Sequence, residues 1–129
     1  MSQPLTIIAD RQILLAEEIF SRFGRVELID GRFLDKSTVK NADVLLVGSV
    51  TKVDFSLLKN SKIGFIGSAT SGIDHIDTDY LKKNNIIFAH TSGSNARSVA
   101  EYVLSSLFAI AEYDNFDISK KTIGIIGYG

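Results

Sequence analysis

The chain has 129 residues, of which 45% are hydrophobic and 22% are charged, as in an ordinary globular protein. Its 14 basic and 15 acidic residues give a formal net charge of -1 and form no basic run, which argues against a nucleic-acid partner. Without cysteine, a signal-peptide pattern or an apolar run of the ~18 residues that a membrane-spanning helix needs, the sequence predicts a soluble cytoplasmic protein with no thiolate chemistry.

The first part of the chain alternates short apolar runs with helical or polar segments. In order, the pattern predicts a strand at Leu5–Ala9, a helix at Arg11–Phe23, a strand at Val26–Ile29, a loop with a short helical turn at Gly31–Lys40, and a strand at Val44–Val47. Asp10 is placed to cap the helix, and Gly24 to end it in a left-handed conformation. The side chains expected on or near the apolar face of this helix are Leu14, Leu15, Ile19, Phe20 and Phe23.

The second part continues the same alternation. It predicts a brief helix at Phe55–Lys59, a strand at Ile63–Ile66, a helix capped by Asp77 that ends at Asn84-Asn85, a strand at Ile86–Ala89, a long helix at Ala96–Glu112, and a strand at Thr122–Ile126. Strands that are apolar throughout are typical of a sheet covered on both faces. With helices between them they imply right-handed crossovers and a parallel sheet, so the predicted class is α/β.

Three loops that follow predicted strands are rich in glycine and hydroxyl side chains: Gly48–Lys52, Gly67–Gly72 and Thr91–Asn95. The carboxyl ends of parallel strands meet at one edge of the sheet, where open α/β sheets bind their ligands. Small residues expose backbone N–H groups and hydroxyls add donors, so this edge is expected to hold a carboxylate or phosphate. The alternative is that Ser, Gly, Thr and Asn are present only because they form loops.

Other polar residues carry weaker signals. His75 lies between two aspartates in "GIDHID", where a general base or a metal ligand is conceivable. Because no second histidine stands at ligand spacing, we expect His75 to pack or hydrogen-bond locally. His90 lies at a strand end and could face the site, but a structural role is expected. Glu101 and Glu112 lie in the long helix, where we expect them to be solvated or paired with neighbours.

The sequence "TIGIIGYG" joins the last predicted strand to a Gly-x-Gly turn. In a dinucleotide-binding unit, the first glycine permits the tight turn and the second lets the backbone approach the pyrophosphate. Two glycines alone fit an ordinary strand end as well. A third glycine, a following helix and an acidic ribose partner are absent from this chain.

Four segments in order, "VGSVTKV", "GFIGSATSGIDHID", "SGSNARSVAEYV" and "TIGIIGYG", resemble the D-2-hydroxyacid dehydrogenase family from Ile7 to Gly129. The resemblance implies a flavodoxin-like substrate domain, here residues 1–95. Residues 96–129 would then be an interdomain helix, the first strand and the Gly-x-Gly turn of an incomplete Rossmann domain. Within the family, the sequence is most similar to a branch whose members use NAD to oxidise 4-phosphoerythronate to the 2-oxo acid, towards pyridoxal phosphate. The intact enzyme would be a homodimer.

The same resemblance assigns roles to particular positions. Ser49, Thr70 and Gly72 would contact the small phosphorylated 2-hydroxy acid. Asn95 and Ser98 would approach the nicotinamide, and the pyrophosphate turn would begin at Gly127, Tyr128 and Gly129.

Two departures from the family pattern bear on function. Gly48 stands where this branch has arginine, which removes a cation near the acid; either Lys52 compensates or a different acid binds. The catalytic histidine, its glutamate partner and the substrate-binding arginine have no counterpart in residues 1–129, so we expect these residues alone to lack dehydrogenase activity. The alternatives are a free-standing flavodoxin-like module that binds a small anion, and a module that associates with itself through its last strand.

Overall fold

A computed structural model describes residues 3–126. The chain forms two compact units, Met1–Ser92 and Gly93–Gly129, and each is described by itself. None of the described helices is long and apolar enough to cross a membrane.

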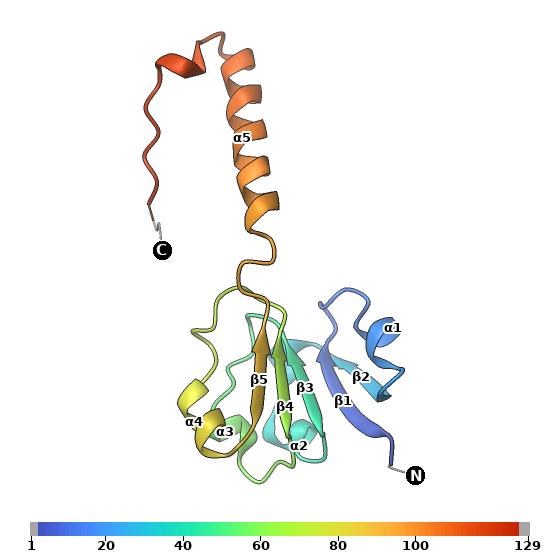
Figure 1. Ribbon diagram of the computed structural model, residues 1–129. Helices are drawn as coiled ribbons and strands as arrows, with labels where there is room; N and C mark the ends of the chain where they lie inside the picture. Colours follow the sequence, from blue (N-terminus) through green and yellow to red (C-terminus); the bar gives the residue numbers. More distant parts are fainter. Residues whose placement is uncertain (1–2, 127–129) are drawn as a thin grey trace. The chain divides into compact units, whose positions relative to one another are not determined.

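The first unit is built on a five-stranded parallel sheet with the strand order β2-β1-β3-β4-β5 (Figure 1). The strands are β1 (Leu5–Asp10), β2 (Gly24–Ile29), β3 (Val44–Val47), β4 (Phe65–Ser68) and β5 (Ile87–His90). This order is the flavodoxin-like one. It confirms the α/β class and the flavodoxin-like sheet predicted from the sequence, with the fourth and fifth strands displaced by one or two residues towards their carboxyl ends.

Helices cover the two faces of the sheet unequally. On one face, α2 (Lys36–Val39), α3 (Phe55–Leu58) and α4 (Thr78–Lys83) pack their apolar side chains against Ile8, Leu45 and Ile66. On the other face, α1 (Ala16–Phe20) contributes Ala16 and Phe20 to a smaller cluster. Successive residues of β3 alternate between the two clusters, which explains why this strand is apolar at every position.

Three of these helices begin at an aspartate. Asp35, Asp54 and Asp77 accept hydrogen bonds from backbone N–H groups in the first turns of α2, α3 and α4, which satisfies donors that a helix start leaves unpaired. The cap at Asp77 was predicted. The predicted end of α4 is also confirmed, because Asn85 adopts a left-handed conformation with φ 55°.

The first helix is much shorter than predicted. Residues 11–15 form turns, and Leu15 adopts a left-handed conformation with φ 59°, which an α-helix cannot include. Leu14 is 87% exposed and Leu15 62% exposed, so of the five predicted apolar contacts only Phe20 packs against the core. Asp10 does not cap α1; it is the last residue of β1.

Gly24 was also predicted wrongly, because it is the first residue of β2 and not a left-handed helix end. Its register partner in β1 is Leu5. A Cβ atom at Gly24 would overlap the Leu5 carbonyl oxygen. The need for glycine at this position therefore comes from a close approach of two backbones.

The second unit contains α5 (Ala96–Tyr113) and a 3₁₀ turn at Ile118–Lys120. The helix agrees with the prediction, and Glu101 pairs with Arg97 at 2.8 Å as expected of a surface glutamate. The strand predicted at Thr122–Ile126 is not formed, because these described residues have no ladder partner. An apolar β-branched run becomes a strand only when another strand pairs with it.

Candidate functional site at the carboxyl edge of the sheet

The strand order changes direction between β1 and β3, since β2 lies on one side of β1 and β4 and β5 continue beyond β3. Ligands of open parallel sheets bind at such a switch point, beyond the carboxyl ends of the strands. Here β1 ends at Asp10, and β3 is followed by Gly48 and Ser49. The first predicted substrate loop therefore begins at the switch point.

Asp10 is the buried charge of this edge, with only 1% of its surface exposed. Its Oδ1 atom accepts hydrogen bonds from the backbone N–H of Gln12 at 3.1 Å and of Gly31 at 3.3 Å. Its Oδ2 atom has no hydrogen-bond partner among the described residues. Asp10 thus ties the loop after β1 to the turn after β2, and leaves one carboxylate oxygen facing the β3 loop.

The β3 loop packs closely against this carboxylate. A Cβ atom at Gly48 would lie 2.8 Å from Asp10 Oδ2, so glycine at position 48 leaves the space that the carboxylate occupies. The buried Thr51 hydroxyl donates to the carbonyl of Gly31 at 2.9 Å. Between these two anchors, Ser49 is exposed, and no described residue hydrogen-bonds to its side chain.

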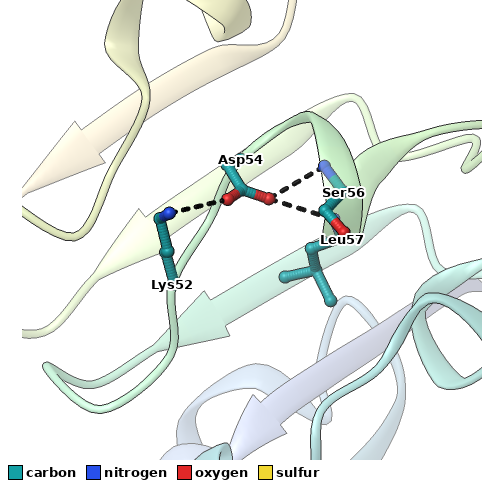
Figure 2. Close-up of polar contacts among 4 residues, drawn as sticks. All are labelled: Lys52, Asp54, Ser56 and Leu57. Carbon is teal, nitrogen blue, oxygen red and sulfur yellow. Dashed lines mark hydrogen bonds and ion pairs between the residues drawn. The ribbon is translucent and has the colours of Figure 1, made fainter.

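Lys52, which the sequence suggested as a substitute for the missing arginine, is held by Asp54. Lys52 Nζ lies 3.3 Å from Asp54 Oδ2, and the other carboxylate oxygen of Asp54 caps α3 through the N–H groups of Ser56 and Leu57 (Figure 2). Burial raises the pKa of the Asp54 carboxyl, but the N–H groups of Leu57 and Ser56 and the Lys52 ammonium outweigh it, so the pKa lies below its ordinary value. The positive charge of Lys52 is therefore compensated within its own loop.

The loop after β4 carries the second predicted substrate position. The Ser68 hydroxyl lies 2.8 Å from the Thr70 hydroxyl, and Thr70 donates to the carbonyl of Gly72 at 3.0 Å. His75 Nε2 lies 3.5 Å from Ser68 Oγ, which agrees with the local hydrogen bond predicted for this histidine. Thr70 and Gly72, two of the three predicted substrate contacts, are thus joined by a hydrogen bond.

Backbone hydrogen bonds join the β3 loop to the β4 loop. The N–H of Val53 donates to the carbonyl of His75, and the N–H of Asp77 donates to the carbonyl of Val53, both at 2.8 Å. Val47 and Ser68 are register partners at the ends of β3 and β4, so Ser49 and Thr70 stand at matching positions, two residues past adjacent strands. Both therefore lie at the same edge of the sheet.

The third loop begins beside the second, because His90 at the end of β5 is the register partner of Ser68. The exposed His90 ring stacks on Phe88 with centroids 5.5 Å apart, and its structural role stays a prediction. On the face of the sheet that α1 covers, an apolar cavity of about 250 Å³ reaches this edge. Its lining includes Ile13, Phe20, Phe65, Ala69 and Thr91.

The predicted cofactor residues belong to the second unit. Asn95 precedes α5, and Ser98 lies exposed in its first turn. Gly127, Tyr128 and Gly129 lie outside the described residues. Within residues 3–126, no three histidine, aspartate or glutamate side chains are grouped so that they could hold a metal ion.

Residues 7–120 match the family described as D-isomer specific 2-hydroxyacid dehydrogenase, catalytic domain. The chain belongs to this family of D-2-hydroxyacid dehydrogenases. The erythronate-4-phosphate dehydrogenases of Chromohalobacter salexigens and Marinomonas sp. are 46% and 50% identical to it over 125 residues, which are 97% of this chain and 33% of each enzyme. The chain therefore spans about a third of the length of these curated relatives.

A solved structure has the same fold. The NAD⁺-bound 3-phosphoglycerate dehydrogenase of Entamoeba histolytica superposes with a TM-score of 0.67 at 21% identity, covering 95% of this chain and 43% of that one. The family resemblance read from the four sequence motifs is confirmed by the family match.

Sequence reasoning missed two features of this edge. It treated Asp10 as a helix cap, whereas Asp10 ends β1 and accepts hydrogen bonds from Gln12 and Gly31. It also missed the bridge between Val53 and Ile76, for which the sequence carries no signal because backbone groups make it.

Proposed function

We propose that this chain supplies the acid-binding part of an NAD-dependent D-2-hydroxyacid dehydrogenase that oxidises 4-phosphoerythronate to the 2-oxo acid, towards pyridoxal phosphate. The observation that carries the proposal is the shared edge: Ser49 and Thr70 follow adjacent parallel strands at matching positions, and the Val53–Ile76 bridge ties their loops together. The relatives named erythronate-4-phosphate dehydrogenase, 46% and 50% identical to this chain, support the choice of acid.

In this proposal, Ser49, Thr70 and Gly72 bind the acid. The two parts of the chain have different roles. Residues 1–95 form the substrate-binding domain, while residues 96–129 begin the NAD-binding domain. The exposed Ser49 hydroxyl is available to a carboxylate or phosphate oxygen. The small residues around it leave room for a ligand close to the backbone.

NAD, when bound, accepts the hydride from the carbon that carries the substrate hydroxyl. Among the described residues, the Asn95 amide and the Ser98 hydroxyl are the polar groups assigned to its nicotinamide, and both are of the hydrogen-bonding type that a carboxamide needs. Gly127, Tyr128 and Gly129 are assigned to its pyrophosphate. The contribution of the described residues is therefore to bind and orient the acid.

A chimera tests the proposal. Residues 1–129 replace the matching third of the Marinomonas enzyme, and we expect the chimera to oxidise 4-phosphoerythronate with reduction of NAD. In the chimera, Ser49→Ala and Thr70→Val should each lower kcat/KM about 10-fold, the value of one hydrogen bond.

Ser61→Ala is the matched control, because Ser61 precedes β4 at the opposite end of the strand. A folded chimera that turns over the acid equally well with Ser49→Ala and Thr70→Val would refute the assigned roles. A folded chimera that oxidises another 2-hydroxy acid but not this one would refute the substrate.

A further inference from the structure

A chain of side-chain hydrogen bonds runs along the β4 loop, and we call it the hydroxyl chain: His75 Nε2, Ser68 Oγ, Thr70 Oγ1 and the Gly72 carbonyl oxygen. The three contacts measure 3.5, 2.8 and 3.0 Å in that order. Ser68 is 3% exposed, so little water reaches its hydroxyl, and its partners within the protein decide how it is oriented.

The direction of each bond follows from counting protons. A carbonyl oxygen only accepts, so Thr70 donates its single hydroxyl proton to the Gly72 carbonyl. Thr70 Oγ1 therefore has no proton left for Ser68, and Ser68 must donate to it at 2.8 Å. The contact between Ser68 Oγ and His75 Nε2 then requires the proton on the histidine nitrogen.

Backbone bonds hold both ends of the hydroxyl chain in place. The N–H of Ala69, between Ser68 and Thr70, donates to the carbonyl of Val47 at 2.9 Å. The carbonyl of His75 accepts from the N–H of Val53 at 2.8 Å. The imidazole and the two hydroxyls are thus carried by backbone that is anchored to β3 and its loop.

We propose that this direction makes Thr70 a specificity-determining acceptor that recognises a hydroxyl group of the bound acid, and that His75 is a positioning residue that acts through Ser68. The inference rests on the proposed function for the presence of an acid at this edge. Thr70 has donated its only proton and accepted one bond, so it offers a ligand one remaining lone pair. An anionic oxygen offers no proton to that lone pair, whereas a hydroxyl does.

Ser49 complements Thr70 at the same edge. It is exposed, and no described residue hydrogen-bonds to its hydroxyl, so its proton is available to a carboxylate or phosphate oxygen. The two positions then divide the recognition of a hydroxy acid, with Ser49 as donor to an anionic oxygen and Thr70 as acceptor from a hydroxyl. A site whose polar groups are arranged to bind a hydroxyl discriminates against the ligand that lacks it.

The direction of the hydroxyl chain is tested by NMR on the full chain without ligand. Long-range ¹⁵N–¹H spectra should place the proton of His75 on Nε2. The hydroxyl protons of Ser68 and Thr70 should be slow enough in exchange to observe, with a coupling across the hydrogen bond from Thr70 to the Gly72 carbonyl. A neutral His75 with its proton on Nδ1, or a Thr70 proton directed at Ser68, would overturn the proposal.

The selectivity is tested by NMR titration of the full chain with 4-phosphoerythronate and with 4-phosphooxybutanoate, the same acid without its hydroxyl groups. Wild-type protein should bind the hydroxylated acid about 10-fold more tightly, the effect of one hydrogen bond. Thr70→Val should bring the ratio of the two affinities close to 1 by weakening the binding of the hydroxylated acid only. Thr70→Ser should retain the ratio.

Variants of His75 separate positioning from folding. His75→Gln places an amide donor close to the position of Nε2 and should preserve the ratio, whereas His75→Phe fills the space without a donor. With His75→Phe, the imidazole no longer holds Ser68 Oγ, so the Thr70 hydroxyl is less well positioned. The affinity for 4-phosphoerythronate should therefore fall, and the ratio with it. The chemical shifts of β3 and β4 amides show whether each variant has kept its fold.

Equal affinity of wild-type protein for the two acids would refute the selectivity. Unchanged ratios in both Thr70→Val and His75→Phe would refute the roles of these residues. Failure of either acid to shift any resonance would count against the proposed function and the selectivity together, while the ligand-free spectra still decide the direction of the hydroxyl chain.

Discussion

Asp10 shows how much one side chain contributes at the switch point of the sheet. Its Oδ1 atom binds the N–H groups of Gln12 and Gly31, while Oδ2 is buried without a partner among the described residues. As a hydrogen-bond acceptor, Oδ1 therefore stabilises two turns, whereas Oδ2 makes no hydrogen bond to a described residue. The two properties can be separated by substitution.

We expect Asp10→Ala to lower the free energy of unfolding by about 1–3 kcal/mol, because it leaves the Gly31 N–H buried without an acceptor. Asp10→Asn keeps the acceptor but puts an amide N–H₂ group where Oδ2 has no partner, so it should lose less stability than Asp10→Ala. Hydrogen exchange of the β1 and β3 amides measures the stability of both variants. Equal losses in the two variants would show that the charge, and not the acceptor, matters.

Gly24 gives a second prediction at the scale of a residue. Gly24→Ala should destabilise the pairing of β1 with β2 by about 1–3 kcal/mol, because the added Cβ meets the Leu5 carbonyl group. Gly64→Ala is the matched control, since a Cβ there meets no atom within 4 Å. Amide exchange in β2 reports the difference, and equal protection in both variants would contradict the close approach.

At the scale of the elements, Asp43 joins three strands at the amino end of the sheet. It immediately precedes β3, accepts a hydrogen bond from the N–H of Thr6 in β1 at 2.8 Å, and forms an ion pair at 3.1 Å with Lys62, which lies just before β4. The Thr6 N–H and the Lys62 ammonium hold the pKa of the Asp43 carboxyl below its ordinary value. The pairing of these strands is therefore linked to pH.

The sign of the pH dependence follows from the direction of the shift. A carboxyl with a lowered pKa in the folded state contributes stability that is complete above its ordinary pKa and is lost as the pH falls through the folded value. Asp43→Asn should therefore be less stable than wild type at neutral pH, with the two converging below about pH 4. Urea unfolding followed by the β1 and β3 amides tests this, and a constant difference at all pH values would contradict it.

At the scale of the whole molecule, the histidines of the chain bear on whether the proposed acid-binding edge can support catalysis by itself. The two histidines of the chain are His75 and His90. His75 Nε2 lies 3.5 Å from Ser68 Oγ and the His90 ring stacks on Phe88, and we expect neither imidazole to serve as the general acid or base. Acid–base catalysis needs such a group within hydrogen-bond reach of the substrate hydroxyl.

We therefore expect residues 1–129 alone to give no NAD-dependent oxidation of 4-phosphoerythronate. The formation of NADH by the purified chain is the measurement, and the chimera with the Marinomonas enzyme is the positive control. Turnover above the rate in buffer, abolished by Thr70→Val, would contradict the prediction and show that the chain supplies its own acid–base group.

The sequence by itself determined the class of the fold and the family. The apolar runs at Leu5–Ala9 and Val44–Val47 are local patterns, and they became parallel strands because a side chain buried on either face of a sheet must be apolar. The loops after β3 and β4 were located in the same way, since a strand followed by glycine and hydroxyl residues is a local signal. The positions of Ser49 and Thr70 at one edge then follow from parallel pairing.

The tertiary structure decided what depends on contacts between distant segments. Asp10 lies beside Gly48 only because β1 pairs with β3, Gly24 is needed only because β2 passes close to Leu5, and Thr122–Ile126 is no strand because no described strand pairs with it. Likewise, the contact between His75 and Ser68 joins two residues seven positions apart in the sequence. Local sequence patterns specify propensity and burial, whereas hydrogen-bond partners are set by the packing of the whole sheet.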